Sequence, residues 1–313
     1  MLSLKEFVRV LSANPGVKRF FATVSTAESP PSAAAAAASN PLGFPVAHTP
    51  GRGPNAILCH GLGCAWDQPQ HLKLEAYARR RGYAFTRFQY RFVGDMERVW
   101  DVDSWTEDLL QVVELAYEHL GEPQIVIAAS AAAQPALRVA MELPDKIDSL
   151  LLLAPGVAMD LSYIDKVVPG SLRLLKQGKR ILHPGVKGGY DTMVDLASLE
   201  KYARKCPVNS GGRISIRCPV KILHGAKDLV VPVEHSVKLV QKLESSQVDL
   251  ELVEGQDHCI EFGVELMSAF DELHSLPERK RRGLGAAPLL DTVTEEEGGE
   301  ESSSPYGNVA ALA

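Results

Sequence analysis

The strongest constraint on the fold is a series of short apolar runs, separated by segments with helical periodicity. The runs show almost no alternation of apolar and polar residues, which is typical of strands buried on both faces of a sheet. They occupy residues 56–59, 84–90, 125–128, 150–153, 220–223 and 250–253. The clearest helical pattern covers residues 104–119 and opens with a capping box from Ser104 to Glu107. This alternation predicts a three-layer α/β fold over residues 54–276, with a mostly parallel sheet and helices on both faces.

One connection is too long for a single crossover helix. Residues 156–217 separate two consecutive predicted strands, whereas most connections in compact domains are far shorter. This insertion holds helix-like pieces at 170–180 and 190–205, broken by prolines and glycines. It follows the carboxyl end of a strand, which is where open parallel sheets bind ligands. We therefore predict a helical lid over a binding site.

The two ends of the chain differ from its body. Residues 1–21 combine apolar residues at helical spacing with a basic excess, which favours a mitochondrial transit peptide over a secretory signal. Arg19 precedes Phe21 as at a matrix-protease cleavage site. This predicts a mitochondrial matrix protein; if the segment is an ordinary surface helix, the cytoplasm is expected. Residues 22–53 form a predicted Pro/Ala-rich linker, and residues 277–313 a predicted disordered acidic tail.

Composition excludes several other classes of protein. With 45% hydrophobic residues in 313, the chain has enough apolar material for a large core, yet no run is long enough to span a bilayer. A net charge of -6 leaves no basic excess for a nucleic-acid partner. The five cysteines are scattered and odd in number, without metal-ligand pairs, which favours reduced thiols. We predict no metal and no cofactor.

A serine follows the third apolar run. Ser130 stands where the strand at 125–128 gives way to a helix, a turn that lifts the hydroxyl clear of the sheet. Such a turn closes only with small residues two places before and after, and Ala128 and Ala132 occupy those places instead of the usual glycines. Ser130 is therefore a candidate nucleophile. The alternative is an incidental serine at the start of an alanine-rich helix.

Two later strand ends supply the groups that a serine nucleophile needs. A serine hydroxyl requires an imidazole base, and the imidazole requires a carboxylate to orient it. Asp228 follows the strand at 220–223, and His258 follows the strand at 250–253. Asp257 is an alternative orienting group, but its adjacency to His258 makes that geometry awkward. The order Ser, Asp, His, each after its own strand, is that of an α/β-hydrolase triad.

The first predicted strand ends in a turn that could complete the site. His60 and Gly61 precede Leu62, and a tight turn there would bring the backbone N–H groups of Leu62 and Ala131 onto one oxygen above Ser130. We therefore predict these two amides as the oxyanion hole, with a simple turn as the alternative. His60 and His224 are expected to support loops rather than bind metal.

Several blocks of the chain resemble the α/β-hydrolase superfamily, and within it the mitochondrial palmitoyl-protein thioesterase family, also known as acyl-glucuronide esterases. The blocks are Phe-Gln-Tyr-Arg-Phe-Val-Gly at 88–94, the segment 218–232 and Asp-His at 257–258. The resemblance covers about residues 54–274 and implies the α/β-hydrolase fold, a mitochondrial address and the same triad: Ser130 as nucleophile, Asp228 as acid and His258 as base. The chain departs from the family at the alanines around Ser130 and at His60, where the family has proline.

Two functional hypotheses follow. The first is a serine hydrolase that cleaves a small acyl ester or thioester, or an acylated protein, through an acyl-Ser130 intermediate. In this hypothesis, apolar lid residues could accept an acyl chain or simply pack on the core; they are Val167, Val168, Leu172, Leu174 and Leu175. The second is a non-catalytic binding or scaffold protein of the same fold, motivated by the alanines after Ser130 and by the two tails. No residue separates thioesters from oxygen esters.

Overall fold

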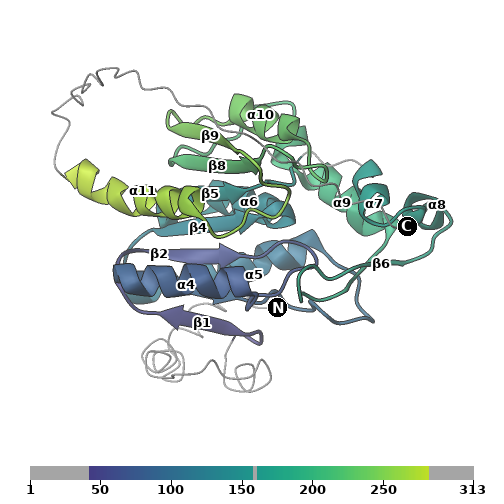
Figure 1. The fold of residues 1–313 in the computed structure, drawn as a ribbon, viewed down its shortest axis with the longest axis horizontal. Coiled ribbons are helices and arrows are strands. Elements are labelled where there is room, and N and C mark those ends of the chain that lie inside the picture. Colours follow the sequence, from purple (N-terminus) through teal and green to yellow (C-terminus); the bar gives the residue numbers. More distant parts are fainter. Residues whose placement is uncertain (1–41, 158–160, 282–313) are drawn as a thin grey trace, which may run out of the picture. The chain divides into compact units, whose positions relative to one another are not determined.

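The computed structural model describes residues 42–157 and 161–281, the last six without their side chains. The predicted transit peptide, most of the predicted linker and nearly all of the acidic tail lie outside these residues. A seven-stranded sheet with the order β1-β3-β2-β4-β5-β8-β9 forms the centre (Figure 1). Its strands are β1 (Val46–Thr49), β2 (Arg52–Cys59), β3 (Tyr83–Phe88), β4 (Gln124–Ala129), β5 (Ile147–Leu153), β8 (Val220–Gly225) and β9 (Val248–Val253). From β3 to β9, all neighbouring strands are parallel.

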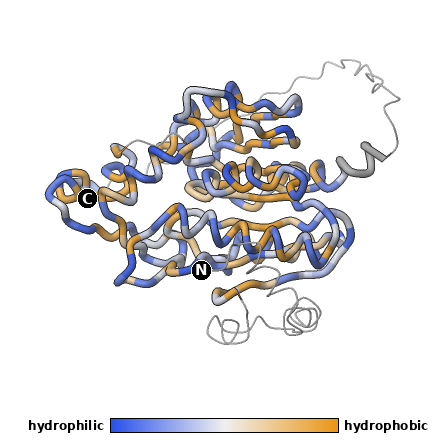
Figure 2. The backbone as a smooth tube through the Cα atoms, turned by 180° about the vertical axis from the view of Figure 1, so that it is seen from behind, coloured by the Kyte–Doolittle hydropathy of each residue, from blue (hydrophilic) through white to orange (hydrophobic). Residues whose placement is uncertain are grey.

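Helices cover both faces of this sheet, which confirms the predicted three-layer architecture. On one face, α4 (Pro69–Arg81) and α11 (Val264–Arg281) pack through Leu74 and Phe270. On the other face, the helices are α5 (Val102–Leu120), α6 (Ala133–Glu142) and α10 (Val233–Lys242). Figure 2 shows hydrophobic stretches in the strands and alternating hydrophobic and hydrophilic residues along the helices. The core therefore lies in two layers, one on each side of the sheet.

The insertion between β5 and β8 contains both helices and strands. Its helices are α7 (Ser162–Val167), α8 (Ser171–Lys176) and α9 (Leu196–Lys205), and its strands β6 (Ile181–His183) and β7 (Thr192–Val194) pair antiparallel. The prediction of a helical lid did not include this hairpin. The helix expected over 190–205 begins only at Leu196, because Asp195 caps it in a capping box with Ser198. Three single-turn 3-10 helices complete the described elements: Ser130–Ala132, Pro144–Lys146 and Pro207–Asn209.

Two further boundaries differ from prediction. The range predicted as linker contains β1, which pairs antiparallel with β3, and the first residues of β2. A four-residue strand flanked by glycines and prolines carries little signal of its own, and the edge of β3 is what orders it. Helix α5 begins two residues before Ser104, because the Asp101 carboxylate accepts the N–H of Asp103 and caps the helix there.

Across residues 42–157 and 161–281, none of the helices combines the length and apolar character required to traverse a lipid bilayer.

We predict that Phe270→Ala destabilises the domain by roughly 3–5 kcal/mol, because Phe270 is fully buried and its ring packs beside those of Tyr83 and Phe85. Urea unfolding followed by circular dichroism measures this change. Val264→Ala on the same helix is the matched control, since Val264 is 72% exposed and should change stability by about 0.5 kcal/mol or less. Equal unfolding midpoints for the two variants would show that α11 contributes little to the core.

Candidate active site

Ser130 lies on a strained turn at the end of β4. Its φ of 50° falls in the left-handed region, which a non-glycine residue rarely adopts, and the chain continues directly into a 3-10 turn and α6. Ala131, Ala132 and Ala133 are buried behind it. Ala128 in β4 and Ala132 after Ser130, which stand in place of glycines, are thus compatible with the expected turn, because each adds only one methyl group and both are fully buried.

The chain after the neighbouring strand β2 lies very close to the Ser130 turn. Strands β2 and β4 are parallel, with Cys59 opposite Ala128, so Gly61 lies beside Ser130. A Cβ atom on Gly61 would stand 3.1 Å from the Ser130 Cβ and 3.3 Å from the Ala129 carbonyl oxygen. Only a residue without a side chain fits there at no cost. Leu62, the next residue, lines the same cavity as Ser130.

The three predicted catalytic residues come together at one edge of the sheet. The hydroxyl of Ser130 lies 2.9 Å from Nε2 of His258, and Nδ1 of His258 lies 2.8 Å from Oδ2 of Asp228. With Nδ1–H donating to the carboxylate, Nε2 is free to accept the serine proton. The residues follow β4, β9 and β8, which are parallel, so their carboxyl ends meet at the same edge.

Asp228 is buried, and four donors surround its carboxylate. Oδ1 accepts the N–H groups of Val230 and Val231, both at 2.8 Å, while Oδ2 faces His258 and also Nε2 of His224 at 3.3 Å. Burial alone would raise the pKa of Asp228, but the hydrogen bonds from His224, His258 and the backbone outweigh it and hold the pKa below its usual value. Asp228 is therefore a carboxylate at neutral pH.

His224 contacts the same carboxylate oxygen as His258. It is fully buried, with Nδ1 2.7 Å from the Ser236 hydroxyl and Nε2 2.9 Å from the Val231 carbonyl oxygen. Both partners of Nε2 are acceptors, so Nε2 carries the proton, and the Ser236 hydroxyl donates to Nδ1. The expectation that His224 supports a loop agrees with this geometry, but its contact with Asp228 was not predicted.

Three other titratable side chains near the site have different surroundings from the triad. Asp257 is exposed, and its carboxylate accepts the N–H of Cys259 rather than contacting an imidazole nitrogen. Burial lowers the pKa of His60 to about 3, so it is a neutral ring packed against Tyr90. Burial raises the pKa of Cys64 to about 12, so this cavity residue is a thiol. Among the described residues, no cluster of three or more metal-ligating side chains occurs.

An apolar cavity of about 370 Å³ opens beside Ser130. Its volume lies within the roughly 300–1,000 Å³ of small-molecule sites. The apolar lining comes from the sheet, from the layer of α4 and α11, from the loop that carries His258, and from the lid: Leu58, Leu74, Leu153, Ile260, Leu266, Tyr163, Val167 and Val186. Of the lid residues considered at the sequence level, Val167 lines the cavity, whereas Leu175 is buried in the core and Leu174 is exposed. The cavity therefore extends between α4 and α11.

A glycine-rich part of the lid, residues 184–189, crosses the edge of the site. The N–H of Val186 donates to the Gly63 carbonyl oxygen at 2.7 Å, and the Lys187 ammonium pairs with Glu261 at 3.0 Å. These contacts connect the turn after β2 to the loop that carries His258.

This arrangement of strands, triad geometry and lid identifies the fold. Mouse alpha/beta hydrolase domain-containing protein 10 aligns with a TM-score of 0.61 at 22% identity, over 73% of this chain and 92% of that one. A putative hydrolase from Agrobacterium vitis aligns with a TM-score of 0.62 at 23% identity, over 74% and 94%. These likenesses show that the chain has the α/β-hydrolase fold.

Sequence comparison finds similarity to the same group of proteins that the motifs resemble. The mitochondrial palmitoyl-protein thioesterase ABHD10 of Bos taurus is 27% identical over 221 residues, 66% of this chain and 68% of the relative. The Rattus norvegicus protein of that name is 25% identical over 214 residues, 66% and 70%. No protein-family model matches the chain. The likeness to proteins named as hydrolases supports hydrolase chemistry at this α/β-hydrolase site.

We predict that Asp228→Asn removes a pH-dependent part of the stability. A carboxyl whose pKa is lowered by folding stabilises the native state above its unfolded pKa of about 3.9, and this contribution is lost as the pH falls below that value. The difference in free energy of unfolding between wild type and Asp228→Asn should be flat above about pH 5 and shrink below about pH 4. Denaturant unfolding at a series of pH values measures it.

Asp257→Asn is the matched control for this prediction, because it removes an exposed carboxylate in the same loop region. The difference in free energy of unfolding between wild type and Asp257→Asn should be smaller across the same pH range. A difference for Asp228→Asn that grows as the pH falls would contradict the assignment of Asp228 as a stabilised carboxylate.

Proposed function

We propose that this chain is a serine hydrolase that cleaves acyl thioesters or esters through an acyl-Ser130 intermediate. The observation that carries this proposal is the continuous hydrogen-bonded chain from Ser130 through His258 to Asp228, at the wall of an apolar cavity. A hydroxyl bonded to an imidazole, which is itself oriented by a buried carboxylate, is the arrangement that activates serine for acyl transfer.

In the first half-reaction, Oγ of Ser130 attacks the acyl carbon while its proton passes to Nε2 of His258. The carbonyl π electrons move to oxygen, which gives a tetrahedral oxyanion. The carboxylate of Asp228 stabilises the imidazolium that forms, at 2.8 Å from Nδ1. The backbone N–H groups of Leu62 and Ala131 are proposed to bind the oxyanion. Gly61, directly before Leu62, allows the turn after β2 to pack against Ser130.

The first half-reaction ends when the tetrahedral intermediate collapses. The bond to the leaving group breaks, His258 protonates the departing thiolate or alkoxide, and the acyl ester of Ser130 remains. In the second half-reaction, the site returns to its starting state. Water then donates a proton to His258 and attacks the acyl-serine, and collapse of the second intermediate releases a carboxylic acid and restores the Ser130 hydroxyl. The protons and bonds of both half-reactions balance with Ser130, His258 and water alone.

The lining of the cavity favours an acyl chain as the group that enters it. Leu74 of α4 and Leu266 of α11 provide an apolar wall, so an extended hydrocarbon would be desolvated there. The relatives named palmitoyl-protein thioesterases support a thioester as the scissile bond, and their mitochondrial names support the proposed matrix address. In this proposal residues 1–21 are the transit peptide, and residues 156–217 are the lid.

We predict that a fluorophosphonate probe labels the full chain at Ser130, as mapped by peptide mass spectrometry. Ser130→Ala should lose the label and reduce hydrolysis of a p-nitrophenyl acyl ester by at least about 10³-fold, because the nucleophile is gone. His258→Ala should also lose labelling. Ser104→Ala, a serine on α5 outside the triad, is the matched control and should keep both.

Two results would contradict this proposal. One is full esterase activity in Ser130→Ala. The other is a folded wild-type protein that neither takes the probe nor hydrolyses acyl esters or thioesters, which would favour the non-catalytic binding or scaffold alternative.

We predict that Leu74 sets the acyl-chain length. Leu74→Trp should shift the chain-length optimum of kcat/KM towards shorter acyl groups, since it fills the wall of the cavity, and Leu74→Ala should shift it towards longer ones. A change of about tenfold is expected for the longest chains, because each methylene in an apolar pocket is worth about 1–3 kcal/mol. A series of acyl-thioesters from acetyl to palmitoyl measures this, with acetyl as the internal control. An unchanged optimum in both folded variants would place the acyl chain elsewhere.

A further inference from the structure

Tyr202 joins the lid to the turn that carries Ser130. It lies on α9, is almost fully buried, and its hydroxyl is 3.1 Å from the Ala131 carbonyl oxygen and 2.7 Å from the Gly156 carbonyl oxygen. A tyrosine hydroxyl has one proton, and two carbonyl oxygens can only accept, so the proton is shared between them. A lid side chain therefore holds the backbone directly after Ser130.

Gly156 makes a second contact with the same turn. Its N–H donates to the Ser130 carbonyl oxygen at 2.9 Å. That carbonyl and the N–H of Ala131 belong to one planar peptide unit, on opposite sides of the peptide bond. Fixing the oxygen therefore fixes the direction of the Ala131 N–H, which is the proposed oxyanion donor.

The backbone around Gly156 requires such support. Ala154 has a φ of 43°, in the left-handed region, where β5 ends, and its N–H donates to the Leu223 carbonyl oxygen at 2.8 Å. A strained backbone persists only where its surroundings hold it in place. The Tyr202 hydroxyl is the side-chain group that binds both Gly156 and Ala131.

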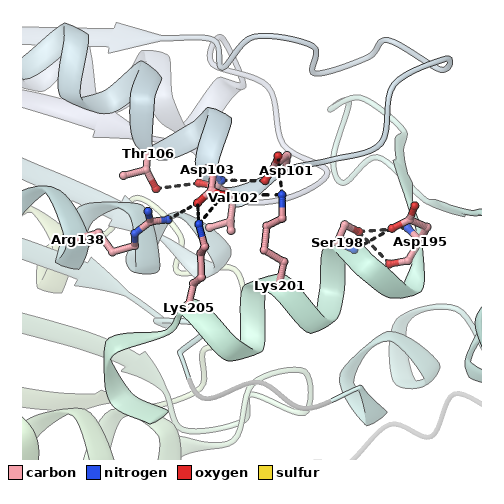
Figure 3. A network of polar contacts seen from close by, with 9 residues as sticks. All are labelled: Asp101, Val102, Asp103, Thr106, Arg138, Asp195, Ser198, Lys201 and Lys205. Atoms are coloured by element: carbon pink, nitrogen blue, oxygen red, sulfur yellow. Dashed lines mark hydrogen bonds and ion pairs between the residues drawn. The ribbon is translucent and has the colours of Figure 1, made fainter. Parts of the chain in front are cut away.

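Tyr202 is itself held by the attachment of α9 to the body of the protein. Lys201 pairs with Asp101 at 3.0 Å, and Lys205 pairs with Asp103 at 2.7 Å, so α9 is fastened to the region where α5 begins (Figure 3). Tyr202 lies between these two lysines in the sequence. The Tyr202 ring packs beside Trp100, at 5.1 Å between ring centroids. The position of the hydroxyl is thus set by the lid helix.

We propose that Tyr202 is a positioning residue that aims the Ala131 N–H at the oxyanion through its bonds to Gly156 and Ala131, and so couples the seating of the lid helix to catalysis. This inference rests on the proposed function. Tyr202 acts through the backbone and does not touch the reacting atoms. Its loss should therefore weaken the binding of the tetrahedral state and leave the binding of the ground state unchanged.

Tyr202→Phe tests this proposal, because it removes only the hydroxyl and keeps the buried ring. We expect kcat to fall about tenfold with KM unchanged, since complete loss of an oxyanion donor costs about 10²–10³-fold and here the donor is only misaligned. The affinity for an acyl trifluoromethyl ketone, which forms a tetrahedral adduct with the serine, should fall by the same factor. The affinity for the matching trifluoromethyl alcohol, which forms no adduct, should not change.

Two variants of the full chain distinguish failure of this inference from failure of the proposed function. Tyr190→Phe removes the hydroxyl of a tyrosine in the same insertion that is 38% exposed and is not in the lining of the cavity beside Ser130, and should match wild type. Ser130→Ala reports on the function itself. If Ser130→Ala is inactive while Tyr202→Phe keeps wild-type kcat and ketone affinity, the role of Tyr202 is overturned and the function stands. A loss of activity in Tyr202→Phe that falls equally on ketone and alcohol affinity would also overturn it, since that is the result of a general packing defect. Activity in Ser130→Ala would overturn both.

Discussion

The site depends on one buried negative charge. The Asp228 carboxylate is shielded from solvent, and a charge out of water is tolerated only where hydrogen bonds replace its hydration. Two backbone N–H groups and two histidines provide them, so the turn after β8 is folded around the carboxylate. Because Oδ2 receives Nδ1 of His258, the same interaction sets the orientation of the imidazole and leaves Nε2 facing Ser130. His224 gives the carboxylate a second buried imidazole partner, so its position does not rest on His258 alone.

The second constraint is geometric and concerns the turn at Ser130. A nucleophile on such a turn is usually flanked by glycines, and here alanines stand in those places. The structure shows Ser130 at positive φ with the alanines packed behind it. Gly61, which follows the neighbouring strand β2, lets the backbone there approach Ser130 closely. The lid contributes as well, through the Tyr202 hydroxyl and the contact between Val186 and Gly63. The insertion thus contacts the two turns expected to carry the oxyanion donors, besides covering a cavity.

The similar proteins and the geometry of the cavity support different parts of the proposed function. Sequence identities of 25–27% to mitochondrial palmitoyl-protein thioesterases support hydrolase chemistry. In the proposed function, the walls of the cavity select the acyl chain. Those walls come from α4, α11, the sheet, the insertion and the loops after β2, β8 and β9, with Val167 the one contribution from the apolar lid stripe considered in the sequence. Specificity is therefore expected to depend on several elements, among them α4 through Leu74.

The sequence by itself determined the parallel α/β architecture, because strands buried on both faces must be apolar throughout and this pattern is local. It also placed Ser130, Asp228 and His258 at strand ends, since parallel strands bring their carboxyl ends to one edge. It could not place β1, whose four residues are ordered by pairing with β3, nor the hairpin of β6 and β7 inside the lid. The contacts of His224 with Asp228 and of Tyr202 with Gly156 were decided by the tertiary structure alone. A buried hydrogen bond depends on where two distant segments meet, and no local pattern of residue types encodes that meeting.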